Sequence, residues 1–245
     1  MRKAKKTEQE KRIEELARIQ EKINAGLIRL TLEEFETWAG VGFTVNHTAK
    51  MLGVNSVSTS PLFNHNCNAK RGVLRTICQK CYSFVMQKRY ETLRKKLWKN
   101  SWILSEILFD EKELPYLYSA TGFFRFEAFG DLMTEIQVVN YFRMAKVNPH
   151  MRCALWTKNP WIIKQAMKHY ELEKPANLVI IGSSYFVNEA MTFQAFPFID
   201  KVFTVYDKKH VKKNGTVINC GGRSCKDCGR CYMNYGGREV SELLK

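Results

Sequence analysis

Seven of the chain's eight cysteines fall into two groups whose spacing suits metal chemistry. The first group has three members and the second has four: Cys67, Cys78 and Cys81, then Cys220, Cys225, Cys228 and Cys231. Four thiolates can saturate a metal centre, whereas three leave a position open for water, substrate or a cofactor. The charged N-terminus has no apolar signal region, so these cysteines indicate metal ligands rather than disulfides.

The C-terminal quartet places its four thiols within twelve residues. Such a compact run suits an iron–sulfur cube, because the corners of the cube need several closely spaced thiolates. Gly221, Gly222 and Gly229 supply the tight backbone needed to wrap an inorganic core. Zinc is the alternative, although a four-cysteine zinc site usually draws on two separated pairs.

The trio has the form Cys67-x10-Cys78-x2-Cys81. Its Cys-x2-Cys pair would also suit a redox pair or half of a zinc site. The position directly after the first predicted strand favours a cluster with one iron left open. A single mixed site that draws on both groups is the remaining alternative. Cys153 lies in an apolar predicted strand, where we expect a core residue.

The net charge of +15 is concentrated beside the cysteine groups. Residues 70–100 carry ten Lys or Arg against one acid, and residues 208–245 carry nine against three. This pattern indicates an anionic ligand or nucleic acid as partner, or a field that offsets metal-bound thiolates. Solvated helix faces are the plainer interpretation. An electron donor is a further expected partner. No apolar run could cross a bilayer, so we expect a cytoplasmic protein without a membrane partner.

The elements that must position these groups alternate between strands and helices from residue 55 onward. We expect strands over 55–60, 122–129, 152–157, 177–181 and 201–206, and helices over 82–109, 134–147 and 159–170. This alternation predicts an α/β fold, a partial (βα) barrel of five to six parallel strands. Two further helices, over 7–30 and 31–38, precede it.

The predicted organisation has three parts. Residues 1–40 form an N-terminal helical extension, 41–210 form the partial barrel with the trio, and 211–245 form a Cys-rich C-terminal extension that holds the quartet. Ligands of such folds bind at the carboxyl ends of the strands. Four groups of residues directly follow predicted strands, namely the trio, Gly130-Asp131, Lys158-Asn159 and Ser183-Ser184. We therefore expect them to share the carboxyl-terminal edge of the sheet.

Four residues near strand ends are the predicted cofactor-binding set: Gly130, Asp131, Glu127 and Ser184. A carboxylate at this edge could hold an amine or a hydroxyl. The alternatives are that Asp131 caps the next helix, that Glu127 faces solvent, and that Ser184 only makes the turn.

The trio after the first strand, the Gly130-Asp131 pair and the repeated βα units resemble the radical S-adenosylmethionine superfamily, which has an amine-binding Gly-Glu at the equivalent place. The quartet is similar to the auxiliary-cluster extensions of many members. Three segments resemble more closely the phage and bacterial proteins of the "gene product 88" type: Asn55-Ser-Val-Ser-Thr-Ser-Pro-Leu, Ile77-Cys-Gln-Lys-Cys-Tyr82 and Ala128-Phe-Gly-Asp-Leu132. The closer resemblance spans residues 55–232. The first spacing of the trio is longer than the superfamily's, and Lys80 replaces its aromatic residue.

These resemblances imply one or two [4Fe-4S] clusters and a radical-enzyme-like barrel in a phage- or bacterium-encoded cytoplasmic protein. An open iron on the trio would bind S-adenosylmethionine, with Gly130 and Asp131 steadying its methionine part and Glu127 and Ser184 as further contacts. The substrate stays open. The rival hypothesis is a zinc-stabilised nucleic-acid-binding protein, in which basic residues 88–99 contact phosphate and Tyr82, Tyr232 and Tyr235 stack on bases.

Overall fold

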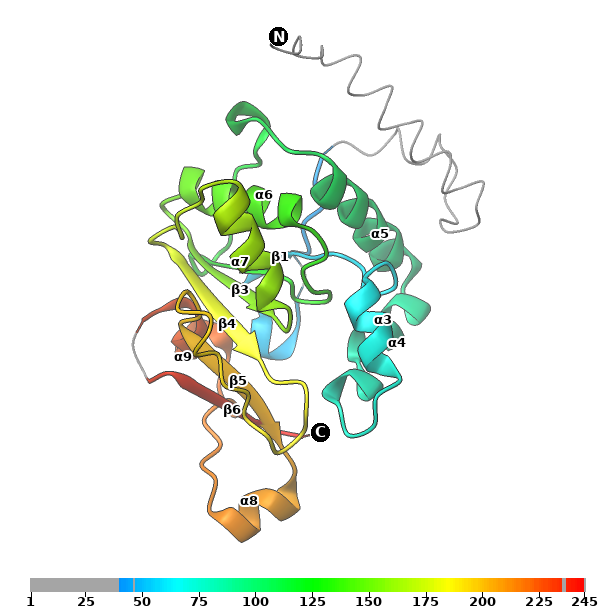
Figure 1. Ribbon diagram of the computed structural model, residues 1–245, viewed down its shortest axis with the longest axis vertical. Coiled ribbons are helices and arrows are strands. Elements are labelled where there is room, and N and C mark those ends of the chain that lie inside the picture. The colour runs from blue at the N-terminus through cyan, green and yellow to red at the C-terminus, as the bar shows by residue number, and fades with distance from the viewer. Residues whose placement is uncertain (1–39, 46, 235–236, 245) are drawn as a thin grey trace.

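The computed structural model describes residues 40–45, 47–234 and 237–244 (Figure 1). The two helices predicted over 7–30 and 31–38 lie outside the described residues. Within the described part of the chain, no helix is both long enough and apolar enough to cross a membrane.

One six-stranded sheet organises the described chain, and all of its strands are parallel. Its spatial order follows the chain order, and the first and last strands do not pair, so the sheet is open (Figure 1). The strands are β1 (Asn55–Val57), β2 (Phe123–Phe126), β3 (Arg152–Thr157), β4 (Leu178–Ser183), β5 (Lys201–Tyr206) and β6 (Glu239–Leu243). The predicted α/β class and partial βα barrel are confirmed.

Helices lie in every connection between consecutive strands except the one from β4 to β5, as expected for parallel crossovers. They are α3 (His65–Arg71), α4 (Tyr82–Arg89), α5 (Glu91–Glu106), α6 (Glu135–Val147), α7 (Pro160–His169), α8 (Lys208–Asn214) and α9 (Cys225–Cys228). Short 3-10 turns are η1 (Ala49–Met51), η2 (Ile77–Lys80), η3 (Glu111–Glu113) and η4 (Arg230–Tyr232). The helix α6 begins where Thr134 accepts a hydrogen bond from the Gln137 amide, and α7 begins with Pro160.

The two faces of the sheet have different coverings. On the outer face, Phe124, Phe126 and Leu155 form the main core with side chains of α5, α6 and α7 such as Tyr141. On the inner face, Phe123, Ala154, Val179 and Ile181 pack against Tyr232 of η4. Because both faces are covered, the central strands are nearly continuous apolar runs.

The structure differs from the predicted elements in three places. The trio is carried by α3, η2 and the start of α4 rather than by a loop. The long basic helix is two helices, because Tyr90 adopts an extended backbone between α4 and α5. The quartet does not lie beyond the last strand, since β6 follows it and pairs with β5. The Glu-Val-Ser-Glu-Leu sequence of β6 is too polar to predict as a strand without its pairing partner.

Candidate metal centres

Asn64 fixes the first cysteine of the trio against the loop after β2. Its side-chain oxygen accepts a hydrogen bond from the Cys67 amide at 3.1 Å and caps α3. Its amide nitrogen donates to the carbonyl oxygens of Asp131 and Leu132 at 2.9 and 3.0 Å. The buried Asn64 therefore couples the position of Cys67 to that of Asp131.

The other two cysteines are tied to the end of β4. The Ile77 amide donates to the Tyr185 carbonyl at 2.8 Å, and the Val187 amide donates to the Arg75 carbonyl at 3.2 Å. Cys78 lies in η2, directly after this pairing, and Cys81 is the N-cap residue of α4. Residues 64–90, which we call the cap, therefore bridge from β1 to the loop after β4.

The three thiols of the trio are close enough to interact electrostatically. Burial is the main cause that raises the pKa of Cys67, and Asp131 and the other two cysteines raise it further. Burial also raises the pKa of Cys78, which Lys158 opposes. All the cysteines are free thiols. A bound cation would therefore have to displace protons from this group, as metal binding to thiols does.

Lys158 lies beside the trio and lowers the pKa of both Cys67 and Cys78. Its backbone amide donates to the Asp131 carboxylate at 2.9 Å, and its ammonium donates to the Ser183 hydroxyl at 2.7 Å. It follows β3 and joins the loops after β2 and β4 around the trio. The sequence placed Lys158 at this edge but gave it no role, because a lysine that follows a strand carries no chemical signal by itself.

Asp131 lies beside the trio but is fully engaged by its own neighbours. One carboxylate oxygen accepts from the Thr157 hydroxyl at 2.6 Å, and the other accepts from the Lys158 amide. Burial raises the pKa of Asp131, while Lys158 and Thr157 lower it. The alternative that Asp131 caps a helix is wrong, because Thr134 is the N-cap residue of α6.

Glu127 is buried rather than solvent-facing, and it contacts the helix layer. Its Oε1 accepts hydrogen bonds from Tyr141, Gln137 and Thr59 at 2.6, 2.7 and 3.0 Å. Its backbone has a φ of 59°, an uncommon conformation for a residue with a side chain. Among the described residues, its hydrogen-bond partners are Thr59, Gln137 and Tyr141, none of which belongs to the trio. In the described structure, its role is to hold the loop after β2 against β1 and α6.

The stability of the protein should fall as the pH rises from about 4.5 to about 7, in part because of Glu127. Burial raises the pKa of this carboxyl from 4.5 to about 7. In that window the folded protein retains a proton that the unfolded chain releases, at a cost of up to about 1.4 kcal/mol per pH unit. Urea unfolding at several pH values should show this fall, and Glu127→Gln should flatten it. An equal slope in both proteins would contradict the assignment.

Ser184 lies after β4, but its hydroxyl is already partnered. Its oxygen lies 2.9 Å from the Thr204 hydroxyl and accepts from the Met191 amide at 3.0 Å. This arrangement is that of a turn. Gly130, in contrast, is a place of close approach, since an added Cβ would lie 2.4 Å from the Thr59 carbonyl oxygen. Of the predicted set, Gly130 and Asp131 therefore lie in the loop after β2, which Asn64 joins to Cys67, and Glu127 and Ser184 face other neighbours.

The quartet lies in the connection from β5 to β6, and this connection packs on the inner face of the sheet. Cys225 begins α9 after the N-cap residue Ser224, and Gly229 turns the chain into η4 with a φ of 60°. Cys225 and Cys231 pack against the inner-face cluster that includes Ala154. Of the three glycines that the sequence predicted for a tight backbone, Gly222 and Gly229 have a left-handed backbone and Gly221 does not.

The four thiols of the quartet interact with one another. Burial raises the pKa of Cys231 to about 12, and Cys220, Cys225 and Cys228 raise it while Arg125 lowers it. The Lys50 ammonium lies 3.7 Å from the Cys220 sulfur and pairs with Glu242 at 2.5 Å. Two cations, Lys50 and Arg125, therefore accompany the quartet.

Arg125 and Trp156 place two unused donors on the inner face. The Arg125 guanidinium stacks on the Trp156 ring, 4.3 Å from its centroid. The Nε of Arg125 and the Nε1 of Trp156 are buried and have no hydrogen-bond partner among the described residues. Trp156 belongs to the same cluster as Cys225 and Cys231. Buried N–H groups are normally satisfied. These two therefore fit a group rich in acceptors between the thiols and the sheet, as the sulfur atoms of an iron–sulfur cluster would be.

Comparison of the chain with models of protein families, with curated proteins and with solved structures gives no match. Function must therefore be argued from the chain's own residues. Within the described ranges, no group of three or more His, Cys, Asp or Glu side chains forms a site for a single metal ion. The cysteines of each group are thus electrostatic neighbours without being a preformed single-ion site.

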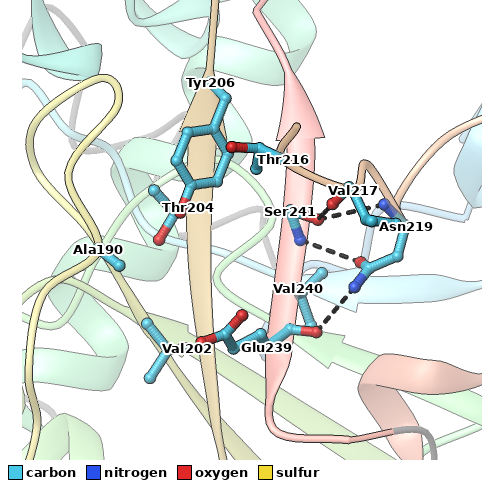
Figure 2. Close-up of a pocket in the computed structure, with 10 residues that line it drawn as sticks. All are labelled: Ala190, Val202, Thr204, Tyr206, Thr216, Val217, Asn219, Glu239, Val240 and Ser241. Atoms are coloured by element: carbon cyan, nitrogen blue, oxygen red, sulfur yellow. Dashed lines mark hydrogen bonds between the residues drawn. The ribbon is translucent and has the colours of Figure 1, made fainter. Parts of the chain in front are cut away.

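A pocket of about 320 Å³ lies over β5 and β6 and is lined by residues such as Thr204, Tyr206 and Asn219 (Figure 2). Its polar groups largely satisfy one another. The Asn219 side chain donates to the Glu239 carbonyl and accepts from the Ser241 amide, and the Ser241 hydroxyl donates to the Val217 carbonyl (Figure 2). No cysteine lines it, so we do not assign the chemistry to this pocket.

Proposed function

We propose that the protein binds iron–sulfur clusters, one at the trio and one at the quartet. The observation that carries the proposal is the pair of unused N–H donors, on Arg125 and Trp156, beside Cys225 and Cys231. The metal-bound thiolates and the inorganic sulfides of a cluster would accept such bonds, and the compact spacing of the quartet within twelve residues favours a cluster over a zinc ion. Lys50 and Arg125 would offset part of the negative charge of the metal-bound thiolates.

The trio supports a second part of the proposal, which is an enzyme of the radical S-adenosylmethionine kind. A three-cysteine cluster supplies an iron with an open position, at which S-adenosylmethionine can bind and be reductively cleaved. Around it, Asn64 holds Cys67, and the pairing with Tyr185 holds Cys78. Lys158 provides a positive charge for an anionic part of a bound molecule, and Asp131 holds the Lys158 backbone in place. Asn64 and Tyr185 would thus orient the cysteines, and Lys158 would bind the cofactor.

Localisation follows from the same proposal. Thiolate ligands persist where cellular thiols stay reduced, so we propose a cytoplasmic protein. The remaining alternative for either group is zinc, in which case the chain would be a zinc-stabilised binding protein without redox chemistry.

Anaerobic purification followed by metal and sulfide analysis tests the proposal. We expect a brown protein with iron and acid-labile sulfide, and an electron paramagnetic resonance spectrum that changes when S-adenosylmethionine is added to the reduced protein. A colourless protein that contains only zinc after this handling would overturn cluster binding. If the spectrum of the clusters does not change on addition of S-adenosylmethionine, cluster binding still holds, but the proposed enzymatic activity is overturned.

Arg125→Met should lower the reduction potential of the quartet's cluster. The substitution removes a cation and an N–H donor next to the sulfur ligands, and both favour the reduced, more negative form. We expect a shift on the order of 60 mV, which is a tenfold change in a one-electron equilibrium. Redox titration measures the shift. Arg152→Met is the control, because Arg152 is exposed at the amino-terminal end of the neighbouring strand β3. Equal potentials in both variants would remove Arg125 from this role.

A further inference from the structure

The cap has an unbalanced positive charge on its exposed surface. Residues 64–90 contain six bases and no acid, namely Lys70, Arg71, Arg75, Lys80, Lys88 and Arg89. All of these except Lys70 are exposed. One of them, Arg75, is paired with Glu189 from the loop after β4 at 3.1 Å. The cap is also the segment that carries the trio, so this charge lies directly beside the predicted reactive site.

Rings and apolar side chains interleave with the bases along α4. The helix buries Ser83, Phe84 and Gln87 and turns the opposite stripe outward. Val85 and Arg89 lie on that stripe with Tyr82, whose hydroxyl donates to the Ala128 carbonyl and whose ring lies beside Phe129. Tyr82 is 56% exposed, Val85 61%, and Tyr90 at the end of the helix 48%. Exposed rings next to exposed bases are what unpaired nucleotides need, for stacking and for phosphate contacts respectively.

A second basic strip lies at the same edge of the sheet. The helix α8 follows β5, and its four lysines, Lys208, Lys209, Lys212 and Lys213, are all exposed. Figure 1 shows α3, α4 and α8 beyond the carboxyl ends of the strands. Because every strand is parallel, this is the edge where Lys158, Ser183 and the trio also lie. The positive charge therefore surrounds the mouth of the partial barrel.

We propose that the exposed faces of the cap and α8 bind single-stranded nucleic acid and present one of its nucleotides to the trio. A duplex would hide the base faces that Tyr82 and Tyr90 could stack on, so an unpaired strand fits better. A flexible chain of phosphates can follow two separate basic helices, which favours it over a compact acidic protein. Presentation to the trio rests on the proposed function, whereas binding of the strand does not.

Fluorescence anisotropy with a labelled single-stranded oligonucleotide tests this inference on the full chain. Lys88→Gln, Arg89→Gln and Lys212→Gln combined should weaken binding tenfold or more and reduce the salt slope by about 2, since each lost phosphate contact contributes about 0.7. The matched control combines Lys146→Gln, Arg152→Gln and Lys168→Gln, which removes equal charge from exposed residues at the amino-terminal edge. We expect the control to bind within twofold of the unchanged protein.

A stacking arm separates nucleic acid from charge alone. Tyr90→Leu should weaken binding of the single strand several-fold and leave binding of heparin, a polyanion without bases, unchanged. The inference would be overturned if the triple variant of the cap and α8 weakened binding no more than the control. It would also be overturned if the protein bound duplex more tightly than single strand. A preference for an acidic protein over the oligonucleotide would overturn it as well. Iron content is measured on the same samples, so a protein without iron that still binds through the cap would overturn only the proposed function.

Discussion

Replacing Cys220 and Cys225 with serine should remove about half of the bound iron and leave the response to S-adenosylmethionine intact. Serine oxygen is a poor ligand for iron in clusters, which are held by thiolates. The quartet is packed on the inner face of the sheet with Ala154 and Tyr232, whereas the trio is held by the cap. We therefore expect the two centres to be lost independently.

The complementary variant, Cys78→Ser with Cys81→Ser, should remove the other half of the iron and the whole response to S-adenosylmethionine. Cys153→Ala is the control, because this thiol is buried in the outer-face core and should leave the iron content unchanged. Iron and sulfide assays with electron paramagnetic resonance measure all three variants, and circular dichroism shows whether they fold. Complete loss of iron from either folded variant would instead indicate one mixed site built from both groups.

Gly130→Ala should destabilise the protein by about 3 kcal/mol or more. The new Cβ would lie 2.4 Å from the Thr59 carbonyl oxygen and 2.6 Å from the Glu127 carboxylate. Thr59 cannot simply move away, because its amide and its hydroxyl donate to Glu127 at 3.2 and 3.0 Å. The main chain after β2 would have to shift, and with it the position of Asp131 beside Cys67.

Urea denaturation of the two proteins gives the free energy of unfolding directly. Gly72→Ala is the matched control, since Gly72 has a right-handed helical backbone and its new Cβ would make only ordinary contact, at 3.8 Å from the Ala69 carbonyl. We expect the control to change stability by no more than about 0.5 kcal/mol. A Gly130→Ala protein as stable as the control would show that the loop after β2 is more adaptable than its hydrogen bonds indicate.

The sequence by itself determined the fold class of this protein and the residues that could bind metal. Apolar strands such as 152–157 and 201–206 were predicted at their observed bounds, because buried parallel strands are continuous runs of apolar residues. Helix α6 was predicted over 134–147 and is observed over Glu135–Val147, although its cap residue is Thr134 and not Asp131. The two cysteine groups could be recognised without a structure, because closely spaced cysteines in one chain are typical of metal ligands.

Only the tertiary structure decided which neighbours those residues have. Tyr90 breaks a helix that its periodicity predicts as continuous, and β6 becomes a strand only by pairing with β5. Glu127 is directed to the helix layer by a backbone conformation that one sequence cannot reveal. Arg125 faces the quartet because alternate residues of a strand point to opposite faces, and what covers each face is set by segments distant in the chain. Spacing along a chain shows which groups are available, but contacts between distant segments decide which of them meet.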